Sequence, residues 1–120
     1  MESLRYVVED TSDNEYLKET TIQRFEYTYE LAWKACKQVL EEKGMYLLFP
    51  TDIFKEAFSA GWLQNAKVGK EMIKARNTTS HLYDEEATNR IVIDIKNKYY
   101  QELRYLQNQL GVIIDARTDT

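Results

Sequence analysis

The chain has 120 residues, of which 43% are hydrophobic and 30% charged, and its formal net charge is −4. This balance predicts one soluble globular domain over residues 1–120. Cys36 is the only cysteine, which excludes an intrachain disulfide and favours a cytoplasmic protein. The chain has only one histidine as a further soft ligand, too few for a zinc site, and we expect neither a metal nor a cofactor. No apolar run is long enough to span a bilayer, so we expect no membrane contact.

Helices dominate the predicted elements, because a chain with four glycines and one proline forms few turns. Leu4, Val7 and Val8 stand at helical spacing and predict a short helix within the first ten residues. A long helix is predicted from about Glu15 to near Gly44, since glycine favours a helix end. Its apolar stripe comprises Ile22, Phe25, Tyr29, Ala32, Trp33, Cys36, Val39 and Leu40.

Two shorter helices are predicted next. Thr51 or Asp52, after the single proline, is the expected N-cap of a helix that Gly61 closes. Asn65 is the expected N-cap of another helix, which runs toward Arg76. The inward-facing residues of the two helices are expected to be Ile53, Phe54, Ala57, Phe58, Val68, Met72 and Ile73.

Asp84 precedes a second long helix, whose apolar period lasts until Gly111. The tail, residues 112–120, ends in the polar run from Ala116 to Thr120 and is expected to be loose. Two long amphipathic helices with two shorter ones between them predict an all-α fold, an antiparallel up-and-down bundle of four to five helices.

Cys36 lies on an apolar stripe and is expected to be a buried, inert thiol. The aromatic residues expected in the core or a dimer interface, rather than as base-stacking platforms, are Phe25, Tyr29, Trp33, Phe54, Phe58 and Tyr99.

Charge is unevenly distributed along the chain. Residues 1–31 have a net charge of −5, whereas residues 63–81 have a net charge of +3. Lys67, Lys70 and Lys74 are spaced three and four apart, which places them on one helix face leading to His81. Such a row is often only a solvated face. A positive strip that runs into the single imidazole also suits a ligand that carries phosphate.

The segment 76–84 contains most of the candidate catalytic and binding residues. Residues 77–81 have middling or poor helix propensity, so the helix is expected to loosen there. Asn77 and His81 are then one turn apart, and Arg76 and Tyr83 two turns apart, which allows all four to share one small surface. The alternative is an ordinary helix end, in which Arg76 and His81 bind a carboxylate of residues 84–86.

Three segments carry a resemblance to a known family. They are residues 22–34 (IQRFEYTYELAWK), residues 54–61 (FKEAFSAG), and the motif segment, in which Arg76-Asn77 is followed by Ser80-His81-Leu82-Tyr83-Asp84. In this order the chain resembles the nucleotidyltransferase substrate-binding family, the HepT-like branch of the HEPN superfamily. The resemblance covers about residues 20–110 and includes the complete R-x4-H-x-Y motif. It departs at the N-terminus, where the family has a fuller first helix.

The resemblance implies an all-α protein that forms a homodimer and is encoded beside a minimal nucleotidyltransferase. Related proteins are toxins that act as metal-independent ribonucleases, and the partner nucleotidyltransferase is the antitoxin, which attaches AMP to the motif tyrosine. By this resemblance Arg76 and His81 are the catalytic pair, Asn77 assists them, and Tyr83 accepts AMP. The alternatives are a non-catalytic substrate-binding subunit of a nucleotidyltransferase and a helical dimer whose polar turn is only structural.

These roles are chemically reasonable. RNA supplies its own nucleophile, the 2′-hydroxyl, so cleavage needs a proton acceptor or donor near neutral pH and a cation for the phosphorane. Histidine is the residue type that titrates in this range, and Arg76 can hold two phosphate oxygens while Asn77 donates another hydrogen bond. One imidazole cannot easily be acid and base at once, so we expect a two-fold dimer to join two motifs. AMP on Tyr83 would fill the phosphate site with negative charge.

Overall fold

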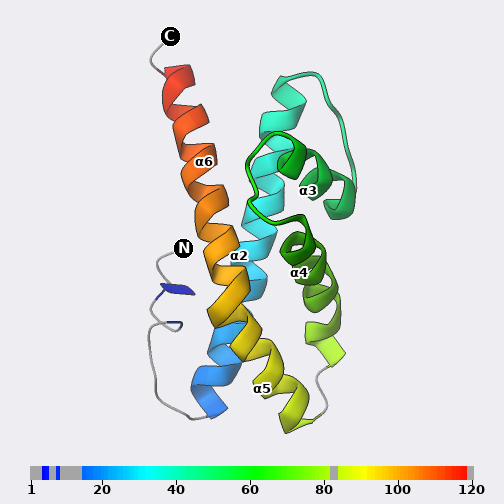
Figure 1. Ribbon diagram of the computed structural model, residues 1–120, viewed down its shortest axis with the longest axis vertical. Helices are drawn as coiled ribbons and strands as arrows, with labels where there is room; N and C mark the ends of the chain where they lie inside the picture. The colour runs from blue at the N-terminus through cyan, green and yellow to red at the C-terminus, as the bar shows by residue number, and fades with distance from the viewer. Residues whose placement is uncertain (1–3, 6–7, 9–14, 82–83, 119–120) are drawn as a thin grey trace.

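The computed structural model describes Leu4, Arg5, Val8 and residues 15–81 and 84–118, and all regular secondary structure in these residues is helical. Along the chain it comprises α2 (Glu15–Glu42), α3 (Pro50–Ser59), α4 (Ala66–Thr78), the 3-10 turn η1 (Thr79–His81), α5 (Glu85–Asp94), the π turn η2 (Ile95–Tyr99) and α6 (Tyr100–Thr118). The predicted all-α bundle is confirmed. In Figure 1, α2 and the α5–α6 run extend in one direction along the molecule, and α4 returns in the opposite direction.

Helix α2 ends as its sequence predicts. Gly44 has a φ of 85°, a left-handed conformation that glycine adopts without a Cβ penalty. The Met45 amide donates to the Leu40 carbonyl at 2.9 Å, and the Gly44 amide donates to Glu41 at 2.9 Å. This pair of bonds satisfies carbonyls that the helix end would leave free. The chain therefore turns sharply here and enters the exposed segment that leads to α3.

The caps of the following helices agree with the sequence in two cases out of three. Asn65 caps α4, and its Oδ1 accepts from the Lys67 and Val68 amides at 3.0 and 3.2 Å. Asp84 caps α5 by accepting from the Ala87 amide at 2.7 Å. The prediction for α3 was wrong, because the proline occupies the first helical position and Phe49 is the N-cap, without a side-chain hydrogen bond.

The second long helix is divided by η2 into α5 and α6. The expectation that the helix ends at Gly111 and that residues 112–120 are loose was wrong for residues 112–118, which continue α6. Gly111 does not have a positive φ, so it is not a helix terminator here. Beyond it Ile113 packs against the core, and this apolar contact supports another helical turn.

The core consists of the predicted stripes. Phe25 stacks on Tyr99 with ring centroids 5.5 Å apart, and the ring of Phe54 lies 5.5 Å from that of Tyr29. Phe58 differs from the prediction in being 41% exposed. Leu4, from the N-terminal segment, is fully buried in the same core, although most of the predicted first helix lies outside the described residues.

The thiol of Cys36 is fully buried on α2, as its position in the apolar stripe predicts. Burial raises the pKa of Cys36 to about 12, because the thiolate would lose its hydration. At neutral pH the thiol is therefore protonated and is a poor nucleophile. None of the described helices is long and apolar enough to cross a membrane.

Candidate functional site

The motif segment lies where α4 ends. Arg76 and Asn77 are in its last turn, and His81 is the last residue of the 3-10 turn that follows. The Thr78 hydroxyl donates to the Ala75 carbonyl at 2.8 Å, and the Thr79 hydroxyl lies 2.9 Å from the Arg76 carbonyl. Side-chain bonds of this kind compete with the regular helix pattern. The helix tightens here, at the poor helix formers of residues 77–81.

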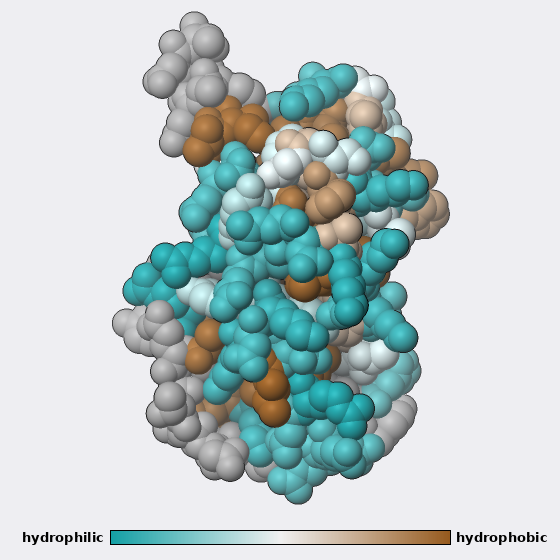
Figure 2. All heavy atoms as spheres, viewed as in Figure 1, coloured by the Kyte–Doolittle hydropathy of each residue, from teal (hydrophilic) through white to brown (hydrophobic). Residues whose placement is uncertain are grey.

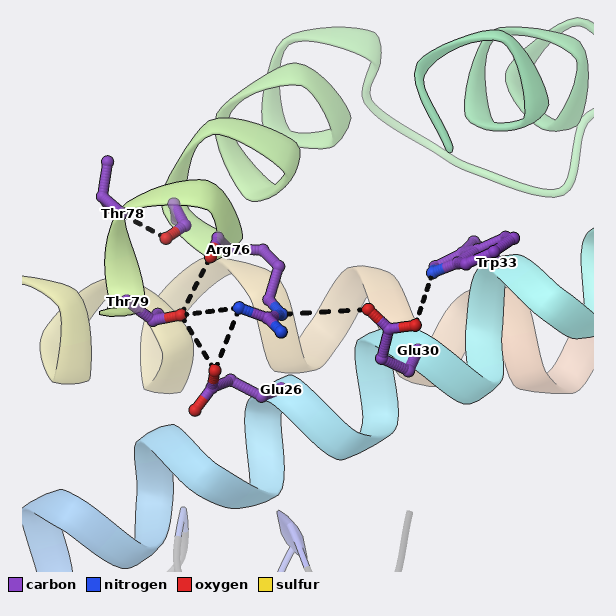
Figure 3. Close-up of polar contacts among 7 residues, drawn as sticks. Glu26, Glu30, Trp33, Arg76, Thr78 and Thr79 are labelled. Atoms are coloured by element: carbon purple, nitrogen blue, oxygen red, sulfur yellow. Dashed lines mark hydrogen bonds and ion pairs between the residues drawn. The ribbon is translucent and has the colours of Figure 1, made fainter. Parts of the chain in front are cut away.

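Arg76 faces α2 and is held by two carboxylates from that helix. Its Nη1 lies 3.0 Å from Glu26 Oε2, and its Nε lies 3.9 Å from Glu30 Oε1 (Figure 3). The side chains of Arg76 and Glu26 are 28% and 29% exposed, so solvent screens their attraction only in part. A guanidinium with two carboxylates beside it is a locally neutralised cation.

Thr79 connects this ion pair to the 3-10 turn. Its hydroxyl accepts a hydrogen bond from Arg76 Nη1 at 3.1 Å. The same oxygen lies 3.1 Å from Glu26 Oε2, so its single proton is donated either to that carboxylate or to the Arg76 carbonyl. Figure 3 shows Arg76, Glu26 and Thr79 converging on one point between α2 and the end of α4. The start of η1 is thereby fixed to α2.

Glu30 is held in turn by its own helix. Trp33 Nε1 donates to Glu30 Oε2 at 3.1 Å, and Lys34 Nζ lies 4.0 Å from the same oxygen.

The alternative that Arg76 pairs with a carboxylate of residues 84–86 was wrong. Asp84 caps α5 and Glu86 pairs with Arg90 at 3.1 Å, while α2 supplies the partners of Arg76.

His81 is exposed and lines a cleft of about 490 Å³ between α4 and the α5–η2 segment. The cleft also contains three cations, Lys74, Arg90 and Lys98, and two carboxylates. Lys98 Nζ lies 3.3 Å from Glu71 and 3.9 Å from Asp94, and Arg90 is paired with Glu86 at the edge of the cleft, so two of the three cations are already paired. Its ionisable groups, with the imidazole neutral, therefore have a formal charge of +1.

Asn77 faces another direction. It is exposed and lines a separate groove of about 440 Å³ with Tyr29 of α2 and with the start of α3. Arg76 thus faces α2, Asn77 lines the groove beside the start of α3, and His81 lines the cleft beside α5, so among the residues that the structure describes these two hollows separate Asn77 from His81. Tyr83, the predicted acceptor of AMP, lies outside the described residues.

The predicted lysine strip is exposed on α4, but its members differ in position. Lys74 lines the His81 cleft. Lys67 and Lys70 are exposed nearer the start of the helix and do not line that cleft. In the parts of the chain that the structure describes, no group of three histidines, cysteines or carboxylates could hold a metal ion.

Glu26 and Glu30 were not predicted as partners of Arg76. Both lie in the segment 22–34 that carries the family resemblance, four residues apart and next to the buried Phe25 and Tyr29. Their spacing places them on one helix face. Nothing in the spacing shows that this face meets the end of α4, which only the packing of the bundle determines.

Comparison with known proteins identifies the class. A family model described as nucleotidyltransferase substrate binding protein like matches residues 1–112, and the chain belongs to this family. A crystal structure of a protein from Thermus thermophilus has the same fold, with a TM-score of 0.82 and 26% identity. The match covers 91% of this chain and 93% of that one. A comparison with curated proteins found no match.

Proposed function

We propose that this protein is a metal-independent endoribonuclease, the toxin of a toxin–antitoxin pair whose antitoxin is a minimal nucleotidyltransferase. The observation that supports it best is the place of His81, in an open cleft that also contains Lys74, Arg90 and Lys98. A proton-transfer group beside cations is the combination that cleavage of an RNA phosphodiester requires. The family name independently indicates a nucleotidyltransferase partner.

The proposed reaction uses no external nucleophile. The 2′-oxygen of RNA attacks the adjacent phosphorus, and the bond from phosphorus to the 5′-oxygen breaks, which leaves a 2′,3′-cyclic phosphate and a free 5′-hydroxyl. One proton leaves the 2′-hydroxyl and another reaches the departing 5′-oxygen. His81 performs one transfer, and in a homodimer the same residue of a second copy performs the other. A monomeric variant that cleaves RNA at full rate would contradict the dimer.

Arg76 and Asn77 have supporting roles in this proposal. Arg76 stabilises charge on the phosphorane once the phosphate displaces Glu26 or Glu30 from its guanidinium. Asn77 donates a hydrogen bond to the substrate. Lys67 and Lys70 extend the positive surface for neighbouring phosphates, and their contribution should fall as salt rises.

The test is cleavage of labelled single-stranded RNA by the purified chain in excess chelator. We expect cyclic-phosphate products from the wild type and at least a roughly 100-fold lower rate from His81→Ala. Lys74→Ala should weaken RNA binding, whereas Lys55→Ala removes an exposed lysine outside the cleft and should not. Equal rates for the wild type and His81→Ala would reject the proposal.

The proposed antitoxin step is tested by mass spectrometry. After incubation with the partner nucleotidyltransferase and ATP, we expect a gain of one or more AMP units on Tyr83 and loss of RNA cleavage. Modification confined to serine or threonine would contradict this step while leaving the nuclease proposal intact.

A second candidate is a non-catalytic subunit that binds or delivers the substrate of the nucleotidyltransferase. One observation favours it, namely that Glu26 and Glu30 already neutralise Arg76. Expression in cells separates the two candidates. Only a nuclease should lose its toxicity when His81 is replaced by alanine, and a substrate-binding subunit should copurify with the nucleotidyltransferase in either form.

A further inference from the structure

A second groove, separate in its lining from the His81 cleft, has no role in the proposed chemistry beyond Asn77. We define the Phe49 groove as the space of about 440 Å³ lined by Tyr29, Phe49, Pro50, Thr51, Asp52, Ile73 and Asn77. It is formed where the start of α3 meets the middle of α2 and the last turn of α4. From its shape and chemistry we propose that it binds a nucleobase.

The principal observation is the exposure of Phe49. It is 65% exposed at the N-cap of α3, although an aromatic ring usually gains stability by burial. Figure 2 shows apolar spheres at the upper right edge of the molecule, where Figure 1 places the segment that links α2 and α3. A flat aromatic face beside a groove is a surface on which a base can stack.

The other lining residues distinguish a base from a phosphate. The groove lining contains no lysine, arginine or histidine, and it includes the exposed carboxylate of Asp52. An anion would be repelled there, whereas a neutral heterocycle would not. The Asn77 amide offers both a donor and an acceptor to a base edge, and Asp52 accepts from an exocyclic amino group. Bases with such an amino group, adenine, guanine and cytosine, should therefore bind better than uracil.

The groove is also adjacent to the motif arginine. Asn77 follows Arg76 in the chain, and Tyr29, which forms part of the lining, directly precedes Glu30 of the ion-pair network on α2. The pKa of Tyr29 is raised to about 12 by burial and by Glu30, while the nearby charge of Arg76 acts in the opposite sense. A phosphate attached to a base on Phe49 reaches Arg76 only after it displaces Glu26 or Glu30 from the guanidinium.

The inference rests on the proposed function for one point only, that the base belongs to RNA. A free nucleotide would present the same base. Binding is therefore measured separately from cleavage, with the His81→Ala chain, whose substitution lies outside the groove. The probes are AMP, UMP and short oligoadenylate and oligouridylate, titrated in moderate salt by calorimetry.

We expect oligoadenylate to bind more tightly than oligouridylate, and Phe49→Ala to weaken oligoadenylate binding about 10-fold. Phe49→Tyr retains a flat ring and should stay within about 2-fold of the parent. Phe58→Ala is the matched control, because Phe58 is also an exposed phenylalanine, lies on α3 and does not line the groove. Unchanged oligonucleotide and mononucleotide binding by Phe49→Ala would overturn the inference.

Other outcomes separate the groove from the nuclease. If wild type does not cleave RNA but AMP binds in a Phe49-dependent manner, the groove proposal stands and its ligand is a free nucleotide. If RNA is cleaved with equal rate and affinity by Phe49→Ala, the nuclease stands and the groove proposal is refuted. The groove proposal is also refuted if Phe49→Ala abolishes only association with the nucleotidyltransferase, since Phe49 then contacts protein.

Discussion

Replacing Glu26 by glutamine should destabilise the fold more than the same change in an exposed ion pair of similar length. The matched control is Glu86→Gln, because Arg90 Nη2 lies 3.1 Å from Glu86 and Arg76 Nη1 lies 3.0 Å from Glu26. The control pair is 69% and 85% exposed, against 28% and 29% for the pair at the motif. The two variants therefore differ in solvent screening, and Glu26 in addition contacts the Thr79 hydroxyl and joins two helices.

The expected magnitudes follow from this difference. Exposed pairs four residues apart contribute about 0.3–0.5 kcal/mol. Removing one partner of a fully buried pair costs roughly 3–5 kcal/mol. The contribution of a half-buried pair, at effective dielectric constants above about 20, should lie between these two values. Removing Glu26 also relieves its repulsion from Glu30, by about 0.2–0.5 kcal/mol. We expect a net loss of about 1 kcal/mol for Glu26→Gln, or about 4 °C in Tm for a domain of this size.

Thermal unfolding in low salt measures both variants, and a double-mutant cycle with Arg76→Gln isolates the pair. We expect a coupling of about 1 kcal/mol that persists in roughly 1 M NaCl, whereas the smaller effect of Glu86→Gln should vanish there. Equal shifts in Tm for the two variants, or no coupling between Glu26 and Arg76, would show that partial burial does not strengthen the motif pair.

Three further predictions concern stability and reactivity. Glu102 is buried, accepts from the Gln64 amide at 3.2 Å, and has a pKa raised above its ordinary value by burial. The folded protein therefore holds the Glu102 proton more firmly than the unfolded protein does, and the free energy of unfolding falls as pH rises above the ordinary pKa of a glutamate. In urea titrations the free energy of unfolding of Glu102→Gln should exceed that of the wild type at about pH 7 but not at about pH 4. Asn65→Ala should cost about 1 kcal/mol by removing the α4 cap, while Asn97→Ala, at an exposed position within η2, should leave the unfolding free energy unchanged. Cys36 should react with an alkylating reagent only at the rate of unfolding, and rapid labelling of native protein would contradict its burial.

Sequence periodicity was sufficient for most of the fold. The apolar stripe from Ile22 to Leu40 and the caps Asn65 and Asp84 are local features, and local chemistry determined them correctly. The errors arose where local signals conflict. Gly111 has no left-handed conformation because α6 continues beyond it, where Ile113 packs against the core. Proline at the first position of α3 shifts the cap to Phe49.

The secondary structure around the candidate site was predictable, but the orientation of its side chains was not. The motif spacing places Arg76, Asn77 and His81 at one helix end, as found. Whether residues separated by one turn face a common cleft depends on which neighbours pack on each side of α4. Here Arg76 faces α2, Asn77 lines the groove beside the start of α3 and His81 lines the cleft beside α5. The two carboxylates that bind Arg76 come from α2, far earlier in the chain. Such long-range pairing has no local sequence signal.

The nuclease proposal depends on whether the purified chain cleaves RNA without metal and through His81. The decisive quantity is the cleavage rate in excess chelator, for wild type and for His81→Ala. We predict 2′,3′-cyclic phosphate products from the wild type and a rate at least roughly 100-fold lower without the imidazole. Cleavage that needs added metal, or that continues unchanged in His81→Ala, would contradict the proposal.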